Sequence, residues 1–117
     1  MEKKKIALFA FNSDPVVFAH CLLNALNIQA RGWEVKVIIE ADATRQVSLL
    51  RNETKPFAPI WQRAKNAKLI DCVCRACAQR NTIVPAVIEQ GLQLWDEMEG
   101  HPSIARYIEQ GFEVMIF

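Results

Sequence analysis

Short apolar runs alternate with amphipathic stretches along the chain of 117 residues. The apolar runs are rich in β-branched and aromatic residues, which is typical of strands buried on both faces of a parallel sheet. Five such strands are expected at residues 6–11, 33–40, 69–73, 92–94 and 113–117. The alternation of strands with helical patterns predicts a parallel sheet with right-handed crossovers and helices on both of its faces.

Helix start and stop signals support this alternation. Asp14 is a good N-cap and Pro15 a good first helical residue, and Gly32 suits the left-handed position after the helix. Further helices are expected at residues 41–50, 60–68, 82–90 and 103–110, with one more after the Cys74–Cys77 turn. In the segment 82–90, Pro85 is tolerable only in the first helical turn.

The composition fits one compact domain spanning residues 1–117, with 51% apolar and 23% charged residues. The net charge of +1 gives no electrostatic footprint for nucleic acid or for an anionic membrane. The apolar run 6–11 is too short for a signal peptide, and no segment approaches the ~20 apolar residues that span a bilayer. We therefore expect a soluble cytoplasmic protein, without nucleic-acid or membrane partners.

The most informative motif is Cys74-Arg75-Ala76-Cys77, at the junction between the third expected strand and the following helix. Backbone N–H groups and the helix dipole at such a junction favour the thiolate, which is the nucleophilic and metal-binding form. A reducing compartment would keep these thiols free for redox, sulfur or metal chemistry. The motif is compatible with a dithiol pair, half of a metal site, a persulfide carrier with a second thiol, or two buried cysteines.

Several polar residues follow the other strands at the same edge of the sheet, where ligands bind in open α/β folds. We expect a site there whose candidates are Asn12, Asp14, Glu40, Asp42, Cys72, Cys74, Cys77, Asp96, Glu97 and His101. His101 can orient or protonate a thiol across the cleft, or be an ordinary loop histidine. Cys72 points to the same side of its strand as Cys74 and is either a third functional thiol or a core residue. Cys21, within the first helix, is expected to be structural.

The chain resembles the DsrE/DsrF-like family of small sulfur-relay proteins over nearly its whole length. The resemblance lies in the segments 5–9 and 12–15, 32–39, 69–78, 100–103 and 111–117. It implies a flavodoxin-like α/β sandwich with a five-stranded, mostly parallel sheet and a homotrimeric or hexameric assembly. A small domain that carries Trp33, Trp61, Trp95 and Phe57 is also expected to hold more large apolar groups than its own core absorbs.

In the sulfur-transferring members of that family, a cysteine after the third strand carries sulfur as a persulfide. The resemblance places Cys74 in that position and Cys77 at the second cysteine of the CxxC branch, whereas Cys72 is an addition to the pattern. We expect Cys74, Cys77 and His101 to carry the reaction without an organic cofactor, with sulfur donor and acceptor proteins as partners. Asn12, Asp14, Glu40, Cys72 and Asp96 are the expected substrate-binding residues.

A metal-binding or assembly module is the alternative prediction. Cys72, Cys74, Cys77 and His101 would then form a Cys₃His zinc site whose thiolates are inert. Two features disfavour this alternative: three ligands would lie in one tight turn, and a domain of this size needs no metal for its stability.

Overall fold

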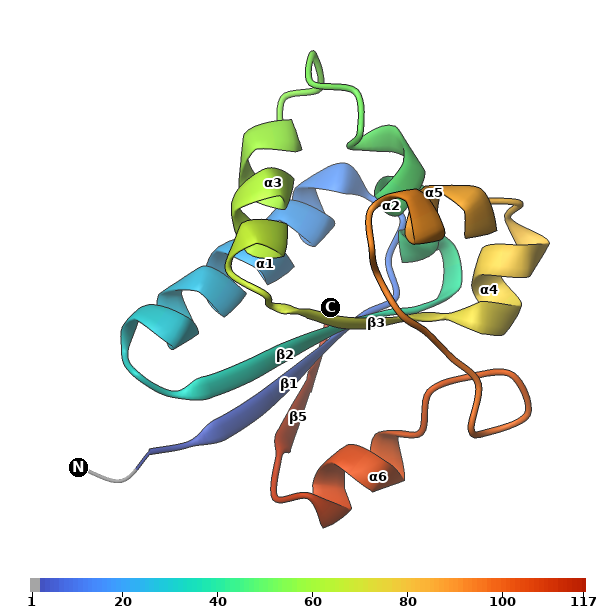
Figure 1. Ribbon diagram of the computed structural model, residues 1–117. Coiled ribbons are helices and arrows are strands. Elements are labelled where there is room, and N and C mark those ends of the chain that lie inside the picture. Colours follow the sequence, from blue (N-terminus) through green and yellow to red (C-terminus); the bar gives the residue numbers. More distant parts are fainter. Residues whose placement is uncertain (1–2) are drawn as a thin grey trace.

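The computed structural model of the protein describes residues 3–117 and contains five strands and six α-helices (Figure 1). The strands are β1 (Lys5–Ala10), β2 (Glu34–Ile39), β3 (Ile70–Cys74), β4 (Leu94–Trp95) and β5 (Glu113–Ile116). The α-helices are α1 (Pro15–Ala30), α2 (Thr44–Leu49), α3 (Ala58–Asn66), α4 (Arg75–Arg80), α5 (Val84–Glu89) and α6 (Ile104–Glu109), and a short 3₁₀ turn, Ala41–Ala43, precedes α2. No helix within residues 3–117 is long and apolar enough to cross a membrane.

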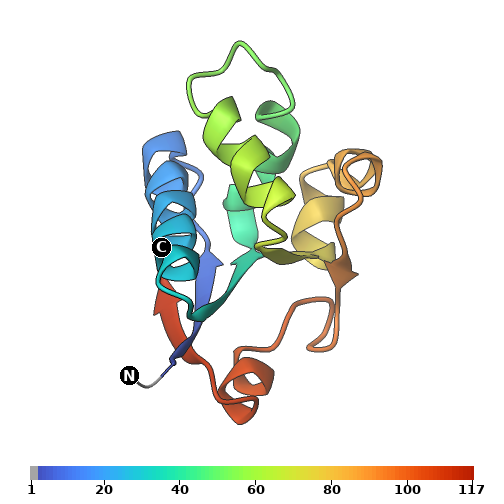
Figure 2. The same cartoon turned by 60° about the vertical axis from the view of Figure 1, so that its left-hand side comes forward.

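All five strands are parallel, in the order β4-β3-β2-β1-β5. The chain steps from β1 to β4 in one direction, so right-handed crossovers bring α1 to α5 to one face of the sheet. The return from β4 to β5 crosses the sheet in the opposite sense and places α6 on the other face. Figures 1 and 2 show this unequal cover, with α6 on its own side of the sheet.

The face covered by α1 to α5 carries the larger hydrophobic core. Leu8, Val37 and Val73 from the sheet pack there with Leu22 of α1 and Trp61 of α3. Trp61 is fully buried, and its indole N–H donates to Gln90 Oε1 at 2.9 Å. This core is the main stabilising layer of the domain, because its apolar side chains come from all three central strands.

The α6 face carries a smaller core, built around Tyr107 of α6. Tyr107 is fully buried against Phe9 of β1 and Phe112, with edge-to-face ring contacts at 5.3 and 6.0 Å. Cys72 and Ile38 contribute the adjoining strand positions. One six-residue helix therefore holds this layer, mainly through one aromatic side chain.

The predicted fold class is confirmed: the domain is a three-layer, flavodoxin-like α/β sandwich with a five-stranded parallel sheet and helices on both faces. Its strand order, 5-1-2-3-4 when read from the β5 edge, differs from the 2-1-3-4-5 order of flavodoxin. The fourth strand was predicted at residues 92–94 but comprises Leu94 and Trp95. The Leu92 N–H still donates to the Val87 carbonyl at the end of α5, so the strand begins later.

The large apolar side chains that remain exposed differ from those expected. Trp61 is buried, and Trp33, Trp95 and Phe57 are partly buried against the two cores. The exposed side chains include Met115 and Ile116 of β5, Ile108 of α6, and Met98. Trp61 therefore belongs to the core beneath α3, and the exposed apolar surface is made by residues other than the four aromatic ones.

Candidate active site

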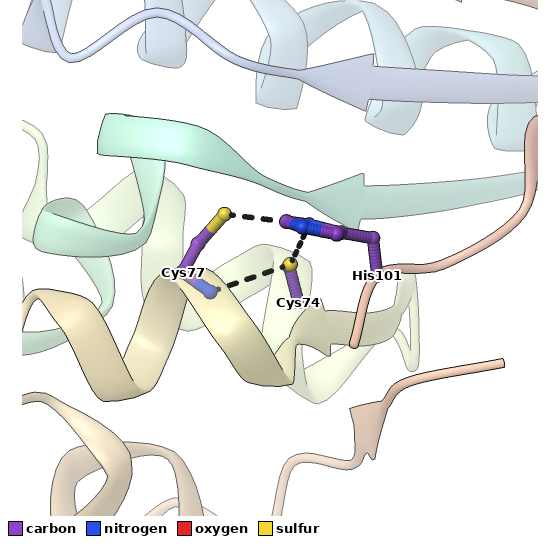
Figure 3. Close-up of side chains that lie close together, drawn as sticks. All are labelled: Cys74, Cys77 and His101. Atoms are coloured by element: carbon purple, nitrogen blue, oxygen red, sulfur yellow. Dashed lines mark hydrogen bonds between the residues drawn. The ribbon is translucent and has the colours of Figure 1, made fainter. Parts of the chain in front are cut away.

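Cys74 occupies the last position of β3 and the N-cap of α4. Its backbone is extended, with φ −62° and ψ 120°, so the chain turns directly from strand into helix at this residue. The Cys77 amide N–H donates to the Cys74 sulfur at 3.5 Å, which places the second thiol one helical turn away (Figure 3). The CxxC spacing thus folds locally into a cap in which one cysteine holds the other in place.

His101 reaches this turn from the loop between β4 and α6. Its Nδ1 lies 3.0 Å from Cys74 Sγ and 3.8 Å from Cys77 Sγ (Figure 3). The backbone groups of Met98 and His101 exchange two hydrogen bonds, which tightens the loop just before the imidazole. Residues 24 to 27 positions apart in the sequence therefore form one thiol–imidazole group.

Gly100 fastens the same loop to the start of α4. The Ala76 N–H donates to the Gly100 carbonyl at 2.9 Å, and Cys74 Sγ lies 3.6 Å from that carbonyl. Gly100 has φ +92°, and a Cβ at this position would lie 3.0 Å from Ala76 Cβ. An ion pair between Arg75 Nε and Asp96, 2.9 Å long, adds a second tie. The loop therefore covers Cys74, and glycine is required for the close approach.

Burial dominates the electrostatics of the thiols. Cys74 is fully buried and Cys77 is 4% exposed. Desolvation raises the pKa of Cys74 to about 12, although the hydrogen bond from the Cys77 backbone acts in the opposite direction. The expected low-pKa thiolate is therefore wrong for the covered site, because loss of water outweighs the amides at the helix start.

The thiol nevertheless has a proton acceptor in direct contact. A neutral His101 imidazole can accept the Cys74 proton at Nδ1, so thiolate and imidazolium can form as a pair within the buried group. The same three side chains could hold a metal ion, since their ligand atoms all lie within 4.8 Å of one another. Nucleophilic thiol chemistry and metal coordination are thus the two chemical capacities of this group.

A cavity of about 400 Å³ lies beside the imidazole. Its lining is mostly apolar and includes Phe11, Met98, Pro102 and Ile104, together with Glu40 and His101. Glu40 is only 6% exposed, and its carboxyl group has no hydrogen-bond or ion-pair partner within residues 3–117. Burial raises the pKa of Glu40 to about 7.

Cys72 does not belong to the thiol–imidazole group. Its Sγ lies 3.5 Å from the Tyr107 hydroxyl, which donates to Asp71, and Asp71 also pairs with Lys36 at 3.7 Å. Burial raises the pKa of Cys72 to about 12. The predicted Cys₃His set is therefore not assembled: the structure brings together Cys74, Cys77 and His101, and Cys72 is part of the α6 core.

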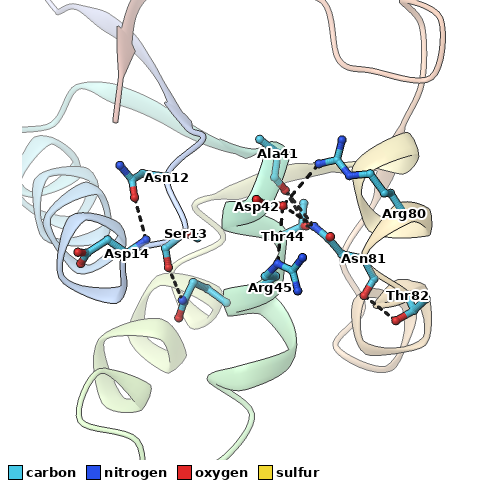
Figure 4. A network of polar contacts seen from close by, with 11 residues as sticks. Asn12, Ser13, Asp14, Ala41, Asp42, Thr44, Arg45, Arg80, Asn81 and Thr82 are labelled. Atoms are coloured by element: carbon cyan, nitrogen blue, oxygen red, sulfur yellow. Dashed lines mark hydrogen bonds and ion pairs between the residues drawn. The ribbon is translucent and has the colours of Figure 1, made fainter.

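The polar residues after β1 serve the start of α1 (Figure 4). Asp14 Oδ1 accepts from the amides of Val16 and Val17, and Asn12 Oδ1 accepts from the Asp14 amide at 2.8 Å. Neither residue lines the cavity beside His101. Asn12 and Asp14, both expected to bind substrate, are thus engaged in helix capping, and Asp96 of the expected set is engaged by Arg75.

Asp42 and Cys21 also lie outside the thiol–imidazole group. Asp42 accepts from Asn81 and pairs with Arg45 and Arg80 on an exposed surface (Figure 4). Cys21 is fully buried in α1, as expected for a structural residue, and burial raises its pKa to about 12.

One contributor to the site, Gly100, was missed at the sequence level. It was included only as part of a resembling segment, and its sequence signal is weak because any loop glycine looks alike. Its role depends on the approach of the β4–α6 loop to α4, which no local pattern reports. The role of Tyr107 in holding Cys72 within the α6 core was also not predicted, because Tyr107 gave only the usual signal of a core aromatic residue in an amphipathic helix.

Comparisons with known proteins find relatives that are described as uncharacterized. No family model matches it. It is 30% identical over 99 residues to the uncharacterized protein MJ0733 of Methanocaldococcus jannaschii, across 85% of this chain and 78% of that protein. An uncharacterized protein of Archaeoglobus fulgidus is 43% identical over 44 residues, across 38% of this chain and 72% of its own.

A solved structure confirms the fold alone. The conserved protein of unknown function BT1422 from Bacteroides thetaiotaomicron superposes with a TM-score of 0.65 at 18% identity. The match covers 95% of this chain and 94% of that one.

Proposed function

The chain belongs to the same family as the uncharacterized protein MJ0733 of M. jannaschii, and we propose that it is a sulfur-relay protein or sulfurtransferase in which Cys74 carries sulfane sulfur. The supporting observation is the 3.0 Å contact between Cys74 Sγ and His101 Nδ1, with Cys77 as a second thiol alongside. The resemblance to the DsrE/DsrF-like family points to the same cysteine.

The loading step uses the imidazole as the proton acceptor. His101 takes the Cys74 proton, and Cys74 Sγ attacks the outer sulfur of a donor persulfide, R–S–SH. The donor's S–S bond breaks, the R–S⁻ group leaves, and the imidazolium returns the proton to it. The products are Cys74–S–SH and R–SH. Transfer to an acceptor thiol is the reverse reaction with a different R group.

Cys77 offers a second reaction by which the Cys74 persulfide can decay. Its sulfur lies within 4.8 Å of Cys74 Sγ. Attack of Cys77 on Cys74 Sγ displaces hydrosulfide and leaves a Cys74–Cys77 disulfide, so the persulfide lasts longer without this thiol. The burial of both sulfurs fits a carrier, since bulk water is kept from the stored sulfur.

The experiment is intact-mass measurement after anaerobic incubation with a sulfane-sulfur donor. The parent protein is expected to gain sulfur that a thiol reductant removes. Cys74→Ser should lose this adduct, and Cys77→Ser should load and keep the sulfur longer. Cys72→Ser is the matched control, because its sulfur lies on the same strand but contacts Tyr107. A parent that never loads, or a Cys74→Ser variant that loads as well as the parent, would refute the assignment to Cys74.

A zinc site is the second candidate, because the ligand atoms of Cys74, Cys77 and His101 all lie within 4.8 Å of one another. Two thiolates and one imidazole are ligands that zinc accepts, and the fourth coordination position would remain open. Metal analysis of anaerobically purified protein separates the candidates. One zinc per chain, with thiols that react only after chelation, would favour the metal site over the carrier.

Self-association remains part of the proposal. Met115 and Ile116 are 47% and 59% exposed on β5, which is an edge strand, and Ile108 of α6 is 57% exposed. Such apolar groups at an edge support self-association, and the resemblance to the DsrE/DsrF-like family suggests a homotrimer or hexamer. Light scattering at micromolar concentration tests this, and a species of 13.3 kDa alone would contradict it.

A further inference from the structure

The unpartnered Glu40 carboxyl group lies in the wall of the cavity that also includes His101. Glu40 follows β2 at the sheet edge and is 6% exposed, and its carboxyl oxygens are not completely enclosed but border this cavity. A carboxylate with so little water around it is stabilised by a cation or by a proton. Within residues 3–117 no lysine or arginine lines this cavity, so the fold itself brings no cation to it.

The rest of the wall is apolar and suits the body of a small organic molecule. Phe11, Met98 and Ile104 supply its larger side chains. Its volume of about 400 Å³ lies within the range of small-molecule sites, about 300–1,000 Å³. A ligand that fits this wall has an apolar body and one positive group, whereas a second carboxylate would be repelled by Glu40.

The cavity and the thiol group share one residue. His101 contacts Cys74 Sγ through Nδ1 and also lines the cavity. Cys74 itself is fully buried under the loop that carries Gly100. A bulky partner therefore cannot contact the sulfur while this loop stays in place, and a small molecule has a ready-made position next to the imidazole.

We propose that this cavity binds the low-molecular-weight sulfur acceptor, a thiol that carries a primary ammonium group, with the ammonium paired to Glu40 and the apolar body against Phe11 and Ile104. This inference rests on the proposed sulfur-carrier function. In the transfer step the acceptor thiol R–SH attacks the outer sulfur of Cys74–S–SH. The S–S bond breaks, His101 moves the proton from the acceptor to Cys74, and the products are Cys74–SH and R–S–SH.

The binding part is tested on the Cys74→Ser variant, which keeps the residues that line the cavity but lacks the thiol proposed to carry sulfur. Calorimetric titration compares three probes with the same ring: 2-phenylethylamine, 2-phenylethanol and 3-phenylpropionate. We expect the amine to bind at least about tenfold more tightly than the alcohol, and the carboxylate to bind least, as for hydrogen bonds to a buried charged group. Equal affinities for the three probes, or a preference for the carboxylate, would overturn the assignment.

Glu40→Gln in the same background identifies the charge responsible. The amide is nearly isosteric, and we expect the amine's advantage over the alcohol to disappear. Glu99→Gln is the matched control, since Glu99 is an exposed acid of the neighbouring loop, and it should leave the amine's affinity unchanged. Retention of the advantage in Glu40→Gln would contradict the proposal even if the variant were less stable.

The transfer part uses persulfide-loaded parent protein and two acceptors, cysteamine and 2-mercaptoethanol. We expect cysteamine to unload Cys74 faster, and this difference to vanish in Glu40→Gln. If the parent loads but no probe prefers the positive charge, the inference fails and the carrier function stands. If the amine binds through Glu40 but the parent never loads, the cavity assignment stands and the carrier function fails.

Discussion

Cys72 and Cys74 lie two positions apart on β3, and strand alternation directs both to the α6 side of the sheet, yet their surroundings differ. Cys72 contacts the Tyr107 hydroxyl within a closed chain that continues to Asp71 and Lys36. Cys74 contacts an imidazole beside a cavity, and the Glu40 carboxyl group in the wall of that cavity has no hydrogen-bond or ion-pair partner within residues 3–117.

The difference shows that the position of a cysteine along the strand decides whether its thiol meets core residues or a proton acceptor. Burial raises both pKa values to about 12, so burial alone does not distinguish the two cysteines. The distinguishing feature is the partner. A phenol hydroxyl can accept a hydrogen bond from Cys72 but is not a base that takes up its proton, whereas an imidazole can take the proton of Cys74. Only the cysteine at the strand's carboxyl end reaches the loops that bring such a group.

The largest expected effect is that of His101→Asn on thiol reactivity. Asn places a polar atom near the Nδ1 position but does not take up a proton near neutral pH. We expect alkylation of Cys74 by iodoacetamide at pH 7 to slow about a hundredfold, the lower end of the range for a positioned base. Peptide mass mapping follows each cysteine, and the slow labelling of Cys72 is expected to stay as it is. An unchanged rate at Cys74 would remove the functional distinction between the two thiols.

Tyr107→Phe tests the other half of the comparison. The ring contacts remain, but Asp71 and Cys72 lose the hydroxyl between them. We expect the free energy of unfolding to fall by about 2 kcal/mol, the cost of leaving buried polar groups unpaired. Urea unfolding measures the loss, and Cys74 alkylation should keep the parent rate. A large change at Cys74 instead would mean that the two thiol regions form one coupled network.

The Glu40 carboxyl group is expected to make the free energy of unfolding depend on pH. The folded pKa of Glu40, about 7, lies above the value of 4.5 for a free glutamate, so folding favours its protonated form. The contribution of Glu40 to the free energy of unfolding is therefore fully present below pH 4.5. It is lost as the pH rises to about 7. The slope is at most about 1.4 kcal/mol per pH unit. Glu40→Gln should flatten this fall in urea unfolding between pH 5 and 6, whereas Glu99→Gln should retain it.

Gly100→Ala gives the smallest expected effect and tests the loop that covers Cys74. The new methyl group would lie 3.0 Å from Ala76 Cβ, at φ +92°. We expect a loss of about 1 kcal/mol in unfolding free energy and faster alkylation of Cys74, because the loop moves away from α4. Gly91→Ala is the control: its φ is +72°, but its methyl group meets nothing within 4 Å. Equal acceleration in both variants would show that the loop does not limit access.

The sequence by itself determined the elements and the fold class. Periodic apolar runs, Asp14 with Pro15 before α1, and Gly32 after it act over a few residues, so their physical consequences are local. The alternation of strands and helices then leaves few topologies, because crossovers are right-handed. The edge at which Cys74, Cys77 and His101 meet followed from this topology, since parallel strands end together.

The tertiary structure decided the state and the partners of the candidate residues. The helix-start argument favoured a Cys74 thiolate, but the loop of Gly100 buries the sulfur, and desolvation reverses the direction of the pKa shift. The sequence allowed either a functional or a core role for Cys72. The contact between Cys72 and Tyr107 of α6 in the folded protein decides for the core role. Asn12, Asp14 and Glu40 all follow strands at the same edge of the sheet, but the first two form helix-capping hydrogen bonds and Glu40 is buried beside the cavity. Burial and contact between distant segments depend on packing, which no local pattern of residues encodes.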